Sequence, residues 1–302
     1  MKRGAAHIER ALGKLLRDRF RRDEPMAKHT TIGAGGCARY FALPRSSREV
    51  ASLVRLATGN TLPYVIIGRG SNLVVRDGGY AGLIIKLGGN FAKVRVGAHS
   101  VSAQAGASFS GLARRMVRMG RPGLEFAVGI PGSVGGAVWM NAGAYGGDVS
   151  QVLYRVSCVD ATGEIFTIQA EHGTFEYRRS RLPAGANVLT ASFRGSPGPI
   201  DRKMLALSER RKLTQPLEHR SFGCAFVNPP GKHAGRLIEE CGLKNTRIGG
   251  AVISEKHANF ILNIGPETGT DDIEALIALA RKEVRKKFGI TLKPEVVIVG
   301  DK

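Results

Sequence analysis

Hydrophobic residues recur along the chain with two different spacings, which predict helices and strands. Apolar positions three and four apart predict amphipathic helices over residues 46–57, 110–119, 201–212, 232–241 and 271–288. Short β-branched runs between Gly- and Asp-rich turns predict strands over residues 64–67, 73–75, 83–87, 152–160, 164–168 and 295–299. This alternation is typical of an α+β protein.

Two local signals support the predicted helix limits. Ser46 and Glu49 have the spacing of a capping box at the start of the first helix. Gly120, Gly242 and Gly289 stand at the ends of three others, where glycine readily takes the left-handed conformation that ends a helix.

The first 28 residues predict a further amphipathic helix. Its apolar positions are Ile8, Leu12, Leu15, Leu16 and Phe20. Because Glu9 and Asp18 interrupt it, the segment resembles neither the apolar core of a signal peptide nor an acid-poor transit peptide. No apolar run approaches the roughly 20 residues of a membrane span. We therefore expect a cytoplasmic protein that does not enter the membrane.

Length and composition favour two domains. The chain has 302 residues, of which 43% are hydrophobic, so it can bury a sizeable core. The pattern changes near residue 200. We expect an N-terminal helix and lead-in over 1–28, an α+β domain over 29–200 and a smaller α/β domain over 201–302, with the final strand able to pack back near the larger domain.

The net charge of +20 raises the question of a polyanionic partner. Aromatic residues make up only 6% of the chain and no nucleic-acid-binding motif is present, so we expect no specific nucleic-acid partner. A basic surface also suits small diphosphates. The four cysteines are widely spaced without a C-x-x-C pair, which favours reduced thiols and no metal site.

Two glycine-rich stretches are the main candidates for chemistry. In residues 66–85, a predicted strand runs into Gly68, Arg69, Gly70, Ser71 and Asn72. Consecutive N–H groups there could converge on an anion; taken alone, a tight β-turn is the simpler interpretation. The dinucleotide fingerprint is excluded because position 73 is Leu, and neither a P-loop nor a nucleophile elbow occurs.

The second stretch, residues 123–147, contains eight glycines and the only tryptophan of the chain. It presents bare backbone between bulky side chains. Together the two stretches favour an extended cofactor with a flat ring system and a pyrophosphate. Packing of two strands around glycine is the alternative.

These stretches, GRGSNLVV and GLEFAVGIPGSVGGAVWMNAGAYGG, closely resemble the flavin-binding core of the UDP-N-acetylenolpyruvoylglucosamine reductase family. The likeness continues through HTTIGAGGCARYF, FEYRRSRLP, RRKLTQP, SFGCAFVNPPGKHAGRLIEECGLK, SEKHANFILN and KPEVVIVG, which covers nearly the whole chain. The compact SEKHANFILN region is similar to the shorter, type II class.

The resemblance implies the FAD-binding fold of the vanillyl-alcohol oxidase type, followed by a substrate domain. It implies non-covalent FAD, with NADPH as electron donor. The pyrophosphate side of FAD would be held by Gly68, Arg69, Gly70, Ser71, Asn72 and Leu73. The rest of the cofactor would be lined by Gly132, Ser133, Gly135, Gly136, Asn141 and Gly143.

The resemblance also implies the reaction, a step of peptidoglycan precursor synthesis. Hydride from flavin N5 would reach the terminal carbon of UDP-N-acetylglucosamine enolpyruvate, and protonation of the adjacent carbon would give UDP-N-acetylmuramate. Arg178 corresponds to the family's catalytic arginine and Glu295 to its catalytic glutamate. A guanidinium that forks onto the substrate carboxylate and a carboxyl group beside it would stabilise the enolate.

The proton donor is where this sequence departs from the family pattern. Cys224 stands where relatives usually have serine. A thiol with an ordinary pKa of about 8.5 is protonated at neutral pH and can donate, so we expect Cys224 to be the acid; a small buried hydrophobe is the alternative.

Four further residues are expected to bind substrate: Tyr145, Tyr177, Lys212 and Asn228. Position 227, often Lys in relatives, is Val, so one basic contact is missing or supplied elsewhere. Either tyrosine could equally be a packing residue. Two other functions stay open from the residues alone: a different FAD-dependent oxidoreductase on the same fold, and a basic nucleic-acid-binding protein.

Overall fold

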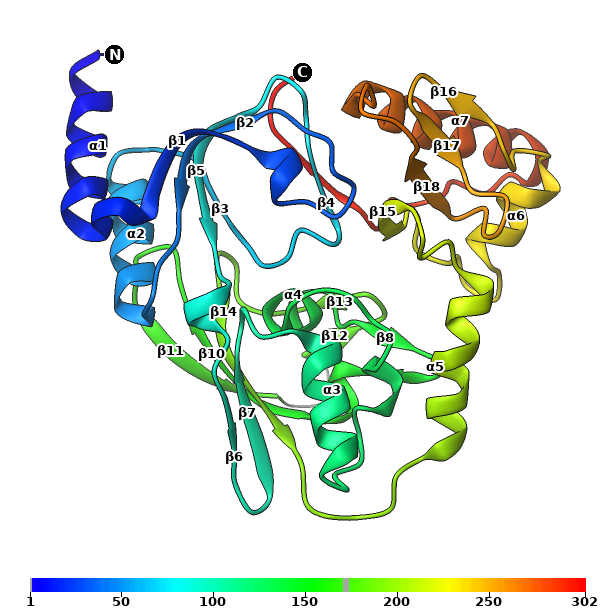
Figure 1. The fold of residues 1–302 in the computed structure, drawn as a ribbon, viewed down its shortest axis with the longest axis horizontal. Helices are drawn as coiled ribbons and strands as arrows, with labels where there is room; N and C mark the ends of the chain where they lie inside the picture. The colour runs from blue at the N-terminus through cyan, green and yellow to red at the C-terminus, as the bar shows by residue number, and fades with distance from the viewer. Residues whose placement is uncertain (1, 171–173) are drawn as a thin grey trace. The chain divides into compact units, whose positions relative to one another are not determined.

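The computed structural model describes residues 2–170 and 174–302 (Figure 1). Contacts divide the chain into two compact units. Unit 1 comprises Met1–Asp23, Tyr40–Arg69 and Gly82–Arg210, and unit 2 comprises Glu24–Arg39, Gly70–Ala81 and Arg211–Lys302. Because both units combine separated stretches, they do not correspond to a single cut near residue 200. The functional division into 1–28, 29–200 and 201–302 stays a prediction.

Unit 1 begins with one helix packed on another. The apolar face of α1 (Lys2–Leu16) lies against α2 (Ser47–Gly59), and Ile8, Leu12 and Leu16 are buried in the core of the unit (Figure 1). The prediction that Phe20 continues this helix is wrong. Arg17 takes the left-handed value φ 57°, which ends α1, and Phe20 opens strand β1 (Phe20–Pro25).

The first sheet has the order β1-β2-β5-β3, with β2 at Cys37–Ala42, β5 at Tyr80–Lys86 and β3 at Tyr64–Ile67. Strands β3 and β5 are parallel. The crossover between parallel neighbours needs a long connection. The connection between β3 and β5 is the segment that contains the first glycine-rich stretch.

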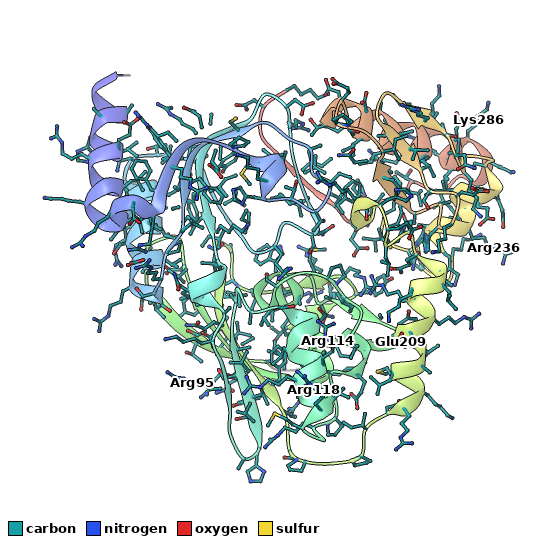
Figure 2. All side chains as sticks on the ribbon, viewed as in Figure 1. Arg95, Arg114, Arg118, Glu209, Arg236 and Lys286 are labelled. Atoms are coloured by element: carbon teal, nitrogen blue, oxygen red, sulfur yellow. The ribbon has the colours of Figure 1, made fainter. Side chains whose placement is uncertain are left out.

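The second sheet is antiparallel, in the order β11-β10-β14-β7-β6. Its strands are β6 (Val94–Val96), β7 (Ser100–Gln104), β10 (Leu153–Val159), β11 (Ile165–Gln169) and β14 (Asn187–Arg194). One face packs on α4 (Val134–Trp139) and the core of unit 1, which also takes in α3 (Phe109–Arg118). Exposed arginines project from β6 and α3, including Arg95, Arg114 and Arg118 (Figure 2).

Unit 2 has a separate core under a sheet of order β15-β18-β17-β16. These strands are β15 (Arg220–Cys224), β16 (Arg247–Ile248), β17 (Ala251–Ile253) and β18 (Phe260–Asn263), accompanied by α6 (Ala234–Glu240) and α7 (Thr270–Phe288). The last strand, β19 (Val297–Val299), pairs in parallel with β4 (Leu73–Val75). The C-terminus therefore returns to the segment that follows the first glycine-rich loop. Helix α5 (Arg202–Thr214) runs from unit 1 into unit 2.

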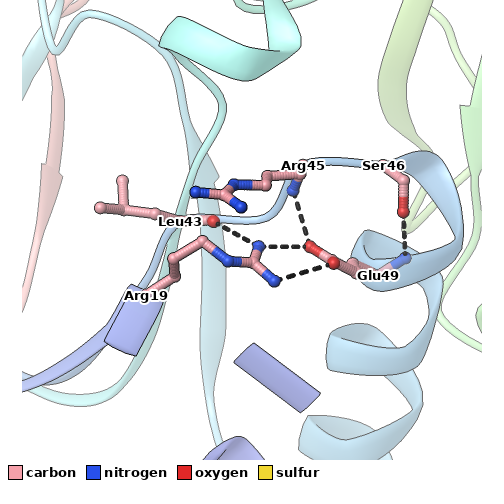
Figure 3. A network of polar contacts seen from close by, with 5 residues as sticks. All are labelled: Arg19, Leu43, Arg45, Ser46 and Glu49. Atoms are coloured by element: carbon pink, nitrogen blue, oxygen red, sulfur yellow. Dashed lines mark hydrogen bonds and ion pairs between the residues drawn. The ribbon is translucent and has the colours of Figure 1, made fainter. Parts of the chain in front are cut away.

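Most predicted elements are observed with ends shifted by at most three residues. The capping box is only half formed. The Ser46 hydroxyl accepts the Glu49 N–H at 3.2 Å, but the Glu49 carboxylate binds Arg19 and accepts the Arg45 N–H at 2.7 Å instead of returning to Ser46 (Figure 3). The Glu49 carboxylate thus binds the Arg19 guanidinium in preference to the Ser46 N–H, because a charged hydrogen bond is stronger.

Helix α4 was not predicted, because its sequence VGGAVW has two glycines and a tryptophan at its end. Packing against the second sheet overrides this weak helix propensity. Among residues 2–170 and 174–302, no helix has the length and apolar character to cross a membrane. Within the same ranges, no three His, Cys, Asp or Glu side chains group together as metal ligands would.

Candidate active site

Two tight hairpins in unit 1 carry several of the predicted site residues. Strands β8 (Gly143–Ala144) and β9 (Gly147–Asp148) are joined by Tyr145 and Gly146, which have φ 57° and 85°. A two-residue loop with both φ values positive is the usual hairpin turn, but its first position normally holds Asn, Asp or Gly. Tyr145 therefore stands at a strained position.

The second hairpin joins β12 (Phe175–Glu176) to β13 (Arg179–Ser180) through Tyr177 and Arg178. Arg178 has φ 59°, where a non-glycine side chain costs about 1–2 kcal/mol. Its guanidinium carbon lies 5.0 Å from the centre of the Tyr177 ring, and Tyr177 is 56% exposed. The hairpin thus presents a stacked aromatic ring and cation at its tip.

Two hydrogen bonds join the hairpins to each other. Arg178 Nη2 donates to the Gly143 carbonyl at 2.6 Å. The Asn141 amide, 2% exposed, donates to the Glu176 carbonyl at 2.9 Å and accepts the Ser150 N–H at 3.0 Å. The structure therefore brings Asn141, Gly143, Tyr145, Tyr177 and Arg178 together. It also shows Asn141, predicted as a cofactor contact, cross-linking the two hairpins through its side chain.

One glycine of each stretch allows close packing within unit 1. A Cβ on Gly68 would lie 1.9 Å from the Ser133 hydroxyl, which caps α4 by accepting the Gly136 N–H at 3.3 Å. A Cβ on Gly135 would lie 2.8 Å from that of Ala105. Gly136, by contrast, is exposed, and Trp139 at the end of α4 is 48% exposed. Bare backbone and an accessible aromatic ring therefore remain only along part of the stretch.

The loop before β4 belongs to unit 2 from Gly70 onward. Gly70 has φ 65°, and a Cβ there would lie 2.1 Å from the His29 carbonyl oxygen. In the described part of the chain, the N–H groups of Gly70, Ser71 and Asn72 donate no hydrogen bond. Leu73 is buried and opens β4, and Arg69, the last residue of unit 1 before the loop, is exposed. Successive free N–H groups after a left-handed turn are an anion-binding arrangement.

Backbone hydrogen bonds in unit 2 bring Glu295 next to the segment that follows Cys224. A bulge interrupts the pairing of β15 with β18 between Ser221 and Cys224, and Gly223 has φ 84°. After the bulge, the Glu295 N–H donates to the Ala225 carbonyl at 2.8 Å. The Glu295 carbonyl accepts from the Asn72 amide at 3.0 Å. The proposed acid, the proposed carboxylate and the anion-binding loop thus meet along one run of backbone contacts.

Cys224 also lines a cavity of about 610 Å³, which Asn228 and His257 line as well. The Asn228 side chain accepts the Ala234 N–H at 2.9 Å, at the start of α6. Burial lowers the pKa of His257 below its ordinary value, so its ring stays neutral. Lys212, predicted to bind the substrate diphosphate, is exposed outside this cavity, and its carbonyl accepts from the Lys256 ammonium at 3.2 Å.

Comparison with known proteins identifies the family. Residues 38–169 match the FAD binding domain, and residues 215–299 match the C-terminal domain of UDP-N-acetylenolpyruvoylglucosamine reductase. The reductase of Streptococcus thermophilus is 43% identical over 290 residues, 94% of each chain. This chain belongs to the UDP-N-acetylenolpyruvoylglucosamine reductase family. It is therefore an FAD-dependent oxidoreductase of peptidoglycan precursor synthesis, as predicted.

Other relatives agree with membership of this reductase family. Reductase 2 of Symbiobacterium thermophilum is 42% identical over 296 residues, 96% of each chain. The crystal structure of the Thermus caldophilus reductase matches 90% of this chain and 96% of that one, with 34% identity and a TM-score of 0.77. The glucose dehydrogenase Phl p 4.0202, 15% identical with a TM-score of 0.50, shares the fold alone. The predicted α+β class with this FAD-binding fold is confirmed.

The residues present fit FAD. Free N–H groups of Gly70, Ser71 and Asn72 suit a pyrophosphate, and the exposed Gly136 and Trp139 suit a flat ring. Two residues with site-like surroundings were missed from the sequence, His257 and Asn259. Both stand in the SEKHANFILN segment, where two polar residues separated by Ala258 precede an apolar strand; this pattern could have indicated a site.

Proposed function

We propose that this reductase converts UDP-N-acetylglucosamine enolpyruvate to UDP-N-acetylmuramate, with NADPH as the electron donor and FAD held non-covalently. The observation that carries the proposal is the hydrogen-bonded pair of strained hairpins. Strain of this kind persists where the surroundings require a side chain to stand in one place. Here it presents Arg178, the one residue whose role in the reaction demands a fixed cation.

When bound, FAD supplies the two electrons, received from NADPH and delivered as hydride to the terminal carbon of the enolpyruvyl double bond. The electron pair of that bond moves to the neighbouring carbon and its carboxylate. Arg178 would hold this carboxylate through its guanidinium, which is oriented beforehand by the Gly143 carbonyl.

The proton that completes the reaction would come from Cys224. Cys224 is among the residues that line the cavity in unit 2, which supports access from a bound ligand. Glu295, whose N–H binds the Ala225 carbonyl next to Cys224, would lie beside the developing charge and, in its protonated form, donate to it. Asn228 and Lys212 are proposed to contact the sugar and diphosphate, and Tyr145 and Tyr177 to border the flavin or sugar.

The proposed cofactor contacts follow the two glycine-rich stretches. Gly68, Arg69, Gly70, Ser71, Asn72 and Leu73 would face the pyrophosphate, and Gly132, Ser133, Gly135, Gly136, Asn141 and Gly143 the rest of FAD. Of these, Asn141 and Ser133 would act chiefly by shaping the backbone, because their side chains bind protein groups. We also propose a cytoplasmic location, because the reactants are water-soluble. We propose no specific nucleic-acid partner, because aromatic residues make up only 6% of the chain and no nucleic-acid-binding motif is present.

One experiment tests the reaction directly. Purified protein, NADPH and enolpyruvyl-UDP-N-acetylglucosamine are mixed, and NADPH absorbance and the sugar product are followed. We expect one NADPH consumed for each UDP-N-acetylmuramate formed. The main rival is another FAD-dependent oxidoreductase on the same fold. It predicts a yellow protein that NADPH reduces but that the enolpyruvyl ether fails to reoxidise.

A further inference from the structure

We infer that Asn259 is a positioning residue for the proton-donating step, because its amide holds the backbone that follows Cys224. The inference rests on the proposed function, in which Cys224 protonates the substrate. Asn259 is 2% exposed and precedes β18, the strand that pairs with β15.

Asn259 holds the segment after Cys224 through three hydrogen bonds. Its backbone carbonyl accepts the Ala225 N–H at 2.8 Å. Its side-chain oxygen accepts the Phe226 N–H at 3.0 Å, and its side-chain NH₂ donates to the Phe226 carbonyl at 2.8 Å. The side-chain amide of Asn259 thus binds both backbone groups of Phe226, as a peptide group of a neighbouring strand would. A fourth contact, from the Asn259 N–H to His257 Nδ1 at 3.2 Å, anchors Asn259 itself.

The three hydrogen bonds from Asn259 to Ala225 and Phe226 form a clamp. Its location next to Cys224 explains how it can orient the cysteine. On the N-terminal side of the cysteine, the bulge and the left-handed Gly223 release the chain from the regular ladder. Cys224 pairs with Phe260, and the next two residues are held by Asn259. The direction of the thiol is therefore set between a bend and a clamp. Loss of the Asn259 hydrogen bonds would leave the segment after Cys224 less firmly held.

The same clamp also extends to the carboxylate. Ala225, held through its N–H by Asn259, accepts the Glu295 N–H through its carbonyl. Phe226, held through both backbone groups, forms a bridge with Pro294. A shift of the segment would thus move the thiol and the carboxyl group together. Proton transfer requires the donor within hydrogen-bond reach of the carbon, so a displacement of about 1 Å can slow the step by roughly 100-fold.

Asn259→Asp tests this inference because the variant has a built-in pH dependence. The new carboxyl keeps the shape of the amide, and burial against the Phe226 carbonyl raises its pKa. When protonated it can donate to Phe226 as the amide did; when ionised it repels that carbonyl. At pH 6 we expect flavin reoxidation by the enolpyruvyl ether within about threefold of wild type. At pH 8.5 we expect it to be roughly 10- to 100-fold slower, with reduction by NADPH unchanged at both values.

Asn263→Asp is the matched control. Asn263 ends β18, and its amide donates to the Ile32 carbonyl at 2.8 Å, outside the Cys224 segment. The inference is overturned if the two variants slow both half-reactions in the same proportion, or if Asn259→Asp shows no pH dependence relative to wild type. If wild-type protein itself fails to react with the enolpyruvyl ether, the proposed function fails instead.

A second variant and a second readout guard against misfolding. Asn259→Ser cannot reach both Phe226 groups and buries no charge, so it should slow reoxidation selectively at every pH. Alkylation of Cys224 in each holoenzyme, measured by mass spectrometry of its peptide, should change in the Asn259 variants and not in Asn263→Asp. Unchanged Cys224 reactivity together with non-selective kinetics would contradict the inference.

Discussion

The two regions that carry the proposed catalytic residues hold their side chains in different ways. In unit 1, Arg178 stands at the tip of a two-residue turn with φ 59° and is oriented by a bond from its own side chain to Gly143. In unit 2, Cys224 and Glu295 lie on backbone that is held by ladder contacts and by two asparagine amides. Arg178 is fixed through its side chain, whereas the contacts at Cys224 and Glu295 fix their backbone.

This difference follows from the length of the two side chains. A guanidinium is long and has several rotatable bonds, so fixing its backbone leaves the charge free to move, and a direct bond at its end is needed. A cysteine sulfur is separated from the backbone by one rotatable bond, so fixing the backbone limits it to a few rotamer positions. Substitutions in the two regions should therefore impair the reaction in different ways.

The largest effect is expected from Arg178→Ala. Loss of the fixed cation removes the contact to the developing carboxylate charge, which should slow flavin reoxidation by substrate roughly 10²–10³-fold. Arg178→Lys should recover little, because an ammonium cannot both bind Gly143 and fork onto a carboxylate. Anaerobic stopped-flow absorbance of the flavin measures both half-reactions. Equal slowing of reduction by NADPH would show that Arg178 maintains the cofactor site instead.

A somewhat smaller effect is expected at Cys224. Cys224→Ala removes the proton donor and should slow product formation by about 10²-fold. Cys224→Ser keeps a donor on the same backbone and should remain within about tenfold of wild type, because the backbone clamps are unchanged. Product formation is followed by chromatography of UDP-N-acetylmuramate. A fully active alanine variant would remove the thiol from the reaction and leave it a small packing residue.

The smallest effect comes from an ion pair outside both regions, and it provides a reference for pure stability changes. Arg19 binds the Glu49 carboxylate with two hydrogen bonds, 2.7 and 3.0 Å, and this lowers the pKa of Glu49 (Figure 3). Glu49→Gln should destabilise the protein by about 1 kcal/mol near pH 7, with both half-reactions unchanged.

The pH dependence of that difference has a defined sign. Because the pKa is lower in the folded state, the stability from Glu49 is fully present above the unfolded value of about 4.3 and is lost as the pH falls through the folded value. Denaturant unfolding of wild type and Glu49→Gln should therefore differ at pH 7 and converge in acid. A constant difference down to pH 3 would contradict the assignment to this carboxylate.

The sequence alone determined the elements with strong periodicity, the family and the residue types at the site. The long helix at Thr270–Phe288 follows from spacing, because its buried apolar residues recur on one face. The strands at Tyr64–Ile67 and Leu73–Val75 follow from short β-branched runs between turns. The motifs likewise indicate FAD, because a family resemblance survives changes such as serine to Cys224.

Only the tertiary structure decided how those residues are held. The formation of α4 and the half-formed capping box depend on partners distant in sequence. The strained turn at Arg178, the tie through Asn141 and the clamp by Asn259 are likewise contacts between segments that meet only on folding. No local pattern records such contacts, because their free energy comes from groups that approach each other only once the chain has packed.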